Sequence, residues 1–152
     1  MKSSIKKTGI AAVLFISLLA LNISASAQCN SVTIAGIKKL APYTHNGQIN
    51  NATIKAGKTV EVHLSFYKGL YYKLQISSED AVGKVSFRVL DENKTEVYNS
   101  SGASQPDSWN FYSNSSQELT IEVKSAENSK KGCVAVVVGM QVPKNNNPIR
   151  NL

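Results

Sequence analysis

Apolar and polar residues alternate along most of this chain, and a period of two residues predicts β-strands. The clearest example is the segment Thr59–Phe66, in which every second residue is apolar and the residues between them are polar or charged. Similar rows, separated by turn residues, lie within residues 52–55, 70–76, 85–89, 95–98, 109–111 and 119–123. Short strands at regular spacing, each with one apolar face, predict an all-β domain.

The segment Gly132–Met140 differs from these strands because it is apolar on both alternating faces. It contains four valines, no charged residue, and one of the two cysteines of the chain, Cys133. A short apolar run of this kind is typical of a strand that is covered on both sides. We therefore expect it to be the central strand, around which the half-buried strands pack.

Residues 30–48 are harder to interpret. Val32, Ile34 and Ile37 suggest a short strand, which residues 41–43 and 45–47 would break. No segment after residue 27 predicts a helix. Seven or eight short strands without a helix predict an antiparallel β-sandwich of jelly-roll or Greek-key topology, with a closed eight-stranded barrel as the alternative.

The first 27 residues predict a cleaved signal peptide. Three lysines precede an apolar run from Ile10 to Leu21, and residues 25–27 match a signal-peptidase site. The residue before Cys29 is Gln28, which is larger than the small residue usual before a lipidated cysteine. We expect a secreted or periplasmic protein of a Gram-negative bacterium, without a transmembrane segment after cleavage. Residues 28–142 would form one domain and residues 143–152 a disordered tail.

The charge of the chain is mildly basic. Removal of the signal peptide lowers the formal net charge from +7 to +4, because three lysines leave with it. The remaining basic residues are single or paired and form no stripe, so we expect no nucleic-acid partner. An acidic envelope surface would be compatible with this charge.

The two cysteines predict a disulfide bond. In an oxidising compartment Cys29 and Cys133 would pair and connect the start of the mature chain to the central strand. The closed loop of roughly 100 residues corresponds to at most about 4.7 kcal/mol in the chain-entropy model. Two free thiols are the alternative.

Three features resemble a known family. Ala56-Gly57 precedes an alternating strand, residues 66–72 (FYKGLYY) form an aromatic hairpin, and residues 89–93 (VLDEN) lead from a strand into an acidic turn. Over residues 55–140 the chain resembles small β-sandwich domains of secreted bacterial proteins, including the bacterial pre-peptidase C-terminal type. Such domains usually accompany an enzyme and help with secretion or polymer binding. No enzyme accompanies the domain here, and the turn after Asp91 lacks their glycine, so the resemblance implies a fold and no activity.

The sequence contains no recognisable catalytic site, and we expect no enzyme. His45 and His63 have neither a G-x-S-x-G motif nor metal-ligand spacing beside them. A cluster of His63 with a carboxylate in a cleft would favour a hydrolase. Residues 79–80 and 91–93 could supply oxygens to calcium, but they lack the spaced pattern of a dedicated loop, so we expect no cofactor, with calcium as the alternative.

Aromatic and polar residues on the predicted outer surface suggest a binding face. An exposed aromatic ring beside amide or charged groups is the usual means of holding a sugar, although cross-strand aromatic pairs also simply stabilise sheets. The candidate ligand-binding residues are Tyr67, Tyr71, Lys73, His63 and Trp109. The predicted function is a non-catalytic binding module for a cell-envelope glycan or protein, with a structural or protein-interaction subunit of an envelope assembly as the alternative.

Overall fold

The structure, a computed structural model, describes residues 29–103 and 107–143, and one short helix and eight strands lie within them. The predicted signal peptide and nearly all of the predicted tail lie outside these residues. The elements are α2 (Asn30–Lys38), β1 (Thr44–Ile54), β2 (Thr59–Phe66), β3 (Tyr71–Ser78), β4 (Val85–Leu90), β5 (Glu96–Asn99), β6 (Ser108–Tyr112), β7 (Gln117–Ser125) and β8 (Gly132–Gln141).

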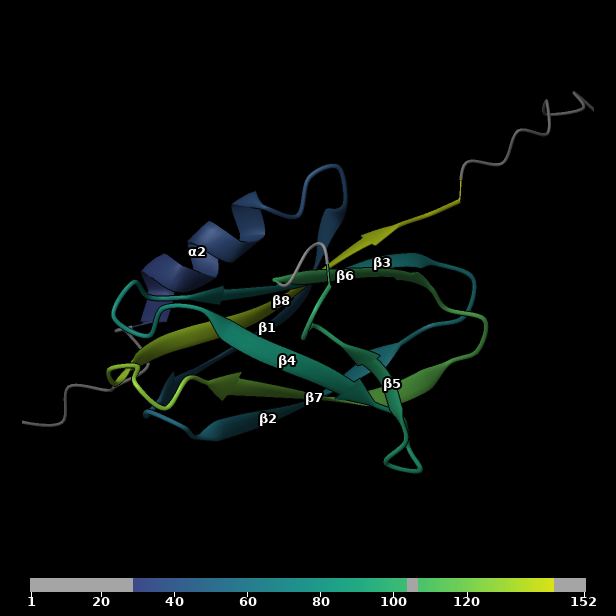
Figure 1. The fold of residues 1–152 in the computed structure, drawn as a ribbon. Coiled ribbons are helices and arrows are strands. Elements are labelled where there is room, and N and C mark those ends of the chain that lie inside the picture. Colours follow the sequence, from purple (N-terminus) through teal and green to yellow (C-terminus); the bar gives the residue numbers. More distant parts are fainter. Residues whose placement is uncertain (1–28, 104–106, 144–152) are drawn as a thin grey trace, which may run out of the picture.

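The strands form two four-stranded antiparallel sheets that pack face to face (Figure 1). The first sheet has the order β1-β8-β3-β6, and the second has the order β2-β7-β4-β5. The pairing is nested: β1 pairs with β8, β2 with β7, β3 with β6, and β4 with β5. A nested set of eight strands folded over into two sheets is the jelly-roll arrangement. The predicted β-sandwich is confirmed, and the alternative of a closed barrel is wrong.

The main core lies between the two sheets and is built from the predicted apolar rows. β2, β3, β4 and β7 each turn one row inward, because successive side chains of a strand point to opposite faces. The buried residues of this core are Leu64, Phe66, Tyr72, Leu74, Ile76, Phe87, Val89, Leu119, Ile121, Val123, Val136 and Val138.

The segment FYKGLYY is not a hairpin. β2 belongs to the second sheet and β3 to the first, so this segment crosses from one sheet to the other. The Lys68-Gly69 turn does reverse the chain, and Gly69 has the positive φ of 87° that such a turn requires. A tight turn between two alternating strands fits both a hairpin and a crossing at the end of a sandwich.

The prediction that the chain has no helix after residue 27 is wrong, because residues 30–38 form α2. Its buried positions are Val32, Thr33 and Gly36, and Cys29 and Leu40 flank them, so the buried stripe has helical spacing. Only two of these five side chains are large and apolar, and Ile34, which suggested a strand, is exposed. A stripe of small and polar residues gives little hydrophobic signal. Residues 45–47 do not break a strand either, since β1 passes through them with a register shift.

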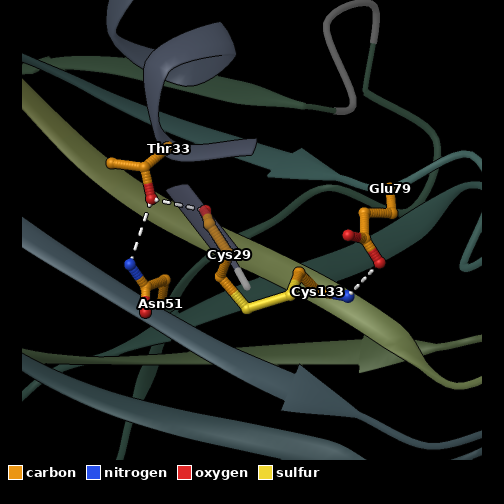
Figure 2. The surroundings of a disulfide bond; sticks show 5 residues. All are labelled: Cys29, Thr33, Asn51, Glu79 and Cys133. Atoms are coloured by element: carbon orange, nitrogen blue, oxygen red, sulfur yellow. Dashed lines mark hydrogen bonds between the residues drawn. A yellow bond between two sulfur atoms is a disulfide. The ribbon is translucent and has the colours of Figure 1, made fainter. Parts of the chain in front are cut away.

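β8 is buried along residues 132–139, as its apolar sequence predicts. Val136 and Val138 enter the main core, while Cys133 and Ala135 pack with Cys29 and Val32 on the opposite face, beneath α2 (Figure 1). The predicted disulfide joins Cys29 to Cys133, which are 104 residues apart in sequence (Figure 2). No helix in residues 29–103 and 107–143 is long and apolar enough to cross a membrane.

Candidate functional site

The outer face of β3 and β6 carries a double row of polar and aromatic side chains beside α2. The inward residues of these strands, Tyr72, Leu74, Ile76, Trp109 and Phe111, contact the core, so the alternate residues point outward. Three cross-strand pairs form the double row, which we call the β3–β6 strip: Tyr71 with Tyr112, Lys73 with Asn110, and Gln75 with Ser108.

The outermost pair of the strip is aromatic. The ring centroids of Tyr71 and Tyr112 lie 4.9 Å apart with planes tilted by 53°, and each side chain is 44% exposed. Next to them, Lys73 is half-buried and Asn110 is exposed. An aromatic pair beside an amide and an ammonium group can stack on an apolar ring face and hydrogen-bond to hydroxyl groups around it.

The strip is held to the end of α2 by charged and polar contacts. The Lys73 ammonium group donates a hydrogen bond to the Lys39 carbonyl at 2.6 Å, and the Lys39 ammonium group pairs with the Asp107 carboxylate at 3.1 Å. The buried Gln75 amide nitrogen lies 3.0 Å from the Asp107 carbonyl and 3.2 Å from its carboxylate. These contacts set the position of Lys73 relative to the tyrosines.

Two titratable groups near the strip have shifted pKa values. Burial alone raises the pKa of Asp107, but the hydrogen bonds from Lys39 and Gln75 and the charge of Lys39 outweigh it and hold that pKa below its usual value. Burial, and then the charge of Asp107, raise the pKa of Tyr98. The Tyr98 hydroxyl donates a hydrogen bond to the Ser108 carbonyl at 3.2 Å.

A depression of about 500 Å³ continues from the inner end of the strip, between α2, the end of β3 and the loop of residues 79–84. Ala35, Ile76 and Val85 are the apolar residues among those that line it, and Lys39 and Asp107 belong to both the depression and the end of the strip. The site is therefore an open surface that runs from an aromatic pair to a shallow pocket. Open shape suits an extended ligand better than a small compact one.

The candidate residues are not all brought together. Tyr71 and Lys73 belong to the strip, whereas Tyr67 is 66% exposed on the crossing segment between the sheets. Trp109 faces inward, where its ring stacks on Tyr98 at 5.0 Å and on Phe111 at 4.2 Å. The sequence did not single out Tyr112, which the β3–β6 pairing sets beside Tyr71.

His63 lies on the outer face of the second sheet, away from the strip. Its Nε2 is 3.1 Å from a Glu61 carboxylate oxygen, and its Nδ1 is 3.2 Å from the Thr120 hydroxyl and 3.6 Å from Glu118. A hydroxyl, an imidazole and a carboxylate in line resemble a catalytic triad. However, Thr120 lies in β7, which is paired on both edges, so the neighbouring backbone N–H groups are used by the sheet and cannot form an oxyanion hole.

The acidic segments considered for calcium have other contacts. One Glu79 carboxylate oxygen accepts the backbone N–H of Cys133 at 2.8 Å (Figure 2), and one Asp91 oxygen accepts the N–H groups of Asn93 and Thr95. Within the part of the chain that the structure describes, no three His, Cys, Asp or Glu residues are grouped so that they could hold a metal ion. Asp91 thus acts as a turn-forming residue.

No family model and no curated protein matches this sequence. Among solved structures, the crystal structure of Aeromonas hydrophila PliG, a periplasmic lysozyme inhibitor of g-type lysozyme, is similar at a TM-score of 0.47 and 14% sequence identity. The similarity covers 62% of this chain and 85% of PliG. A similarity this distant carries no information about the function of this chain. The resemblance to pre-peptidase C-terminal domains stays a prediction.

Proposed function

We propose that this protein is a non-catalytic binding module that holds a glycan chain of the cell envelope along the β3–β6 strip. The observation that carries the proposal is the exposed pair Tyr71 and Tyr112, aligned with Asn110 and Lys73 on one open face. The tyrosine rings offer flat apolar surface to sugar rings, and the amide and ammonium groups offer hydrogen bonds to hydroxyls. The disulfide supports a location outside the cytoplasm, because disulfides persist in oxidising compartments.

A binding role also agrees with the surface around His63. His63 lines an open depression of about 380 Å³ together with Glu118 and Thr120, and its side chain is 53% exposed, with Glu61 and Glu118 about as exposed. Catalysis by a hydroxyl nucleophile needs a site that excludes water and stabilises the oxyanion. The open depression does not exclude water, and the backbone N–H groups of β7 beside Thr120 are bonded to the neighbouring strands.

The proposal is tested by the double substitution Tyr71→Ala/Tyr112→Ala. Truncating a central aromatic residue of a binding surface typically costs about 1–2 kcal/mol, so we expect the pair to lower affinity at least roughly tenfold. The probe is the solubilised envelope glycan of the producing cells, measured by calorimetry. Tyr71→Phe/Tyr112→Phe is the matched variant, which keeps both rings and should keep most of the affinity.

Two controls separate binding from stability. Tyr67→Ala removes an exposed tyrosine outside the strip and should leave binding unchanged, and the melting temperature of each variant shows whether the fold is intact. Capture of a partner from envelope extract, before and after glycan digestion, tests whether the ligand is a glycan or a protein. A protein that stays bound after digestion, together with full affinity in the double alanine variant, would contradict the glycan proposal and favour a protein-interaction subunit.

A further inference from the structure

The outer edge of β1 differs from the other three sheet edges of the sandwich. β1 has eleven residues and contains no Asp, Glu, Lys, Arg or Pro, whereas β5 and β6 have four and five residues. β2 carries Glu61, and the Gln48 side chain of β1 donates to the β2 backbone at the Ser65 carbonyl. Short length, charge and covering groups are how sheet edges avoid pairing with other chains. β1 has none of these protections between residues 49 and 54.

The backbone groups on this edge can be assigned from the ladder pattern. Cys133 of β8 uses its carbonyl to accept the N–H of Glu79 on the β3 side. Because antiparallel hydrogen bonds alternate along a strand, the residues of β1 that bond to β8 are Asn50, Ala52 and Ile54. The N–H and C=O groups of Ile49, Asn51 and Thr53 then point to the open edge, where no strand of the described residues pairs with β1.

We propose that a second copy of this chain pairs with this edge, β1 against β1, in a two-fold dimer centred on Asn51. In this register Asn51 faces Asn51 of the second copy, and Ile49 faces its Thr53, so a β-branched pair forms on each side. No charged side chain opposes another within the paired segment, and Lys55 meets Gly47 of the second copy. A self-complementary patch of this kind is what a two-fold interface requires.

The space beside α2 fits the same dimer. α2 lies over β8, since Cys29 and Val32 pack with Cys133 and Ala135. The two copies of β8 would be three strand spacings apart, roughly 14 Å, while a helix with its side chains is about 10–12 Å wide. The two helices therefore fit side by side above the joined sheet with a narrow gap between them.

Exposed isoleucines are placed to fill that gap. Thr33 of α2 contacts β1, since its hydroxyl accepts a hydrogen bond from the Asn51 amide (Figure 2). Ile37, one turn after Thr33, lies on the same side of the helix, and Ile34 lies above it. Ile34 is 47% and Ile49 is 43% exposed, and both are large apolar residues with water on one side. Pairing of β1 would cover them.

The dimer would also orient the proposed binding surfaces. A two-fold axis at an antiparallel strand pair is perpendicular to the sheet, so both β3–β6 strips would face the same side. They would lie at the two ends of an eight-stranded sheet, about seven strand spacings or roughly 33 Å apart. Two sites on one side of a dimer bind a polymer more tightly than one. The dimer itself does not depend on the glycan proposal.

Sedimentation equilibrium of the oxidised, secreted protein over a concentration series tests the dimer. We expect a dimer that dissociates on dilution. Thr53→Pro should be monomeric, because proline removes an N–H group that lies on the open edge and makes no bond within one copy. Thr53→Val, which keeps that N–H group and the β-branched shape, is the matched control and should dimerise like the parent protein.

A second variant guards against a failure of Thr53→Pro to fold. Ile34→Lys changes an exposed helix position and should raise the dissociation constant at least roughly tenfold, because it places a charge in the closed gap. A parent protein that is monomeric at every concentration would overturn the proposal. So would a folded Thr53→Pro, or Ile34→Lys, that dimerises as tightly as the parent.

Cysteine cross-linking tests the register. In a hydrogen-bonded antiparallel pair the facing Cα atoms are about 5.5 Å apart, which is within the range of a disulfide. Asn51→Cys should therefore give a covalent dimer on a non-reducing gel. Thr53→Cys is the matched control, which faces Ile49 of the second copy and should not cross-link. Absence of cross-linking in Asn51→Cys, or equal cross-linking of both variants, would overturn pairing about Asn51.

Discussion

The two outer faces of the sandwich carry different residues because α2 covers β8 on one of them, the covered face, whereas no helix of the described residues covers the other, the bare face. In the first sheet, the outward side chains of β8 beneath α2 are those of Cys133, Ala135 and Val137. In the second sheet, the outward side chains of β7 are Glu118, Thr120, Glu122 and Lys124. Both strands are central in their sheets. The cover above a strand, and not its place in the sheet, decides whether its outward residues are small and apolar or charged.

Close packing explains the small residues on the covered face. A Cβ atom added to Gly36 of α2 would lie 3.0 Å from the Ser77 hydroxyl and 3.1 Å from a Val137 methyl group. On the bare face, long side chains pair along the sheet surface, such as Arg88 with Glu122 at 2.6 Å. The bare face can gain or lose such pairs with little consequence, whereas the covered face depends on a precise fit.

Among changes that test the difference between the two faces, removal of the disulfide should have the largest effect on stability. Cys29→Ala/Cys133→Ala should lower the free energy of unfolding by about 2–5 kcal/mol, because the loop between the two cysteines is long and α2 loses its covalent attachment to β8. Urea denaturation measures the loss. Amide exchange should then become faster in α2 than in β7, which keeps both of its strand partners.

Reduction provides the control for that experiment. A reductant should destabilise the parent protein by a similar amount and leave the double alanine variant unchanged. A loss well under 1 kcal/mol would show that α2 holds its place by packing alone, and the covered face would then depend less on the disulfide than we infer.

The next largest effect on stability should come from the close packing of α2 against the first sheet. Gly36→Leu should cost about 1–3 kcal/mol, because the added side chain has to displace Ser77 and Val137 of the sheet. Ala35→Leu adds similar bulk one residue away on the exposed side of α2 and should change stability by less than about 0.5 kcal/mol. Thermal unfolding of both variants makes the comparison. Equal costs at the two positions would contradict close packing at Gly36.

The sequence predicted the parts of this fold that depend on apolar side chains. The alternating rows of β2, β3, β4 and β7 and the doubly buried β8 are visible because large apolar residues repeat with a period of two. α2 was missed because its buried side contains Thr33 and Gly36, which carry no hydrophobic signal. The helix covers β8. The apolar outward face of β8 therefore indicated that another element packs on it, although the sequence did not show that this element is a helix.

The candidate site was only partly predictable for a different reason. Tyr71 and Lys73 were selected from their alternation along one strand, which a sequence shows. Their cross-strand neighbours Tyr112 and Asn110 depend on which strands pair, and that pairing joins residues about forty positions apart. Alternation along the chain shows which residues share a face of one strand. It does not show which strands pair, so it could not place Tyr112 and Asn110 beside Tyr71 and Lys73.

The smallest predicted effect compares one ion pair on each side of the molecule. Asp107 links β6 to Lys39 at the end of α2, and its pKa lies below the usual value. A carboxyl group with a lowered pKa stabilises the folded state above its unfolded pKa, and this contribution disappears as pH falls through the folded pKa. Asp107→Asn should therefore lower the free energy of unfolding at neutral pH, by under about 1 kcal/mol since both partners are half-exposed. Below the usual pKa of aspartate, near pH 3.9, the difference should close.

Glu61→Gln is the matched change on the bare face, where Glu61 contacts His63 and Lys94 along the surface of the second sheet. Denaturation of both variants across a pH series should show a gap that closes toward acid pH for Asp107→Asn and an effect within about 0.5 kcal/mol for Glu61→Gln. A larger effect for Glu61→Gln would mean that the charged side chains on the outer face of the second sheet contribute more to stability than those beside α2. In that case His63 and its carboxylates, and not the strip beside α2, would be the more constrained polar site of the molecule.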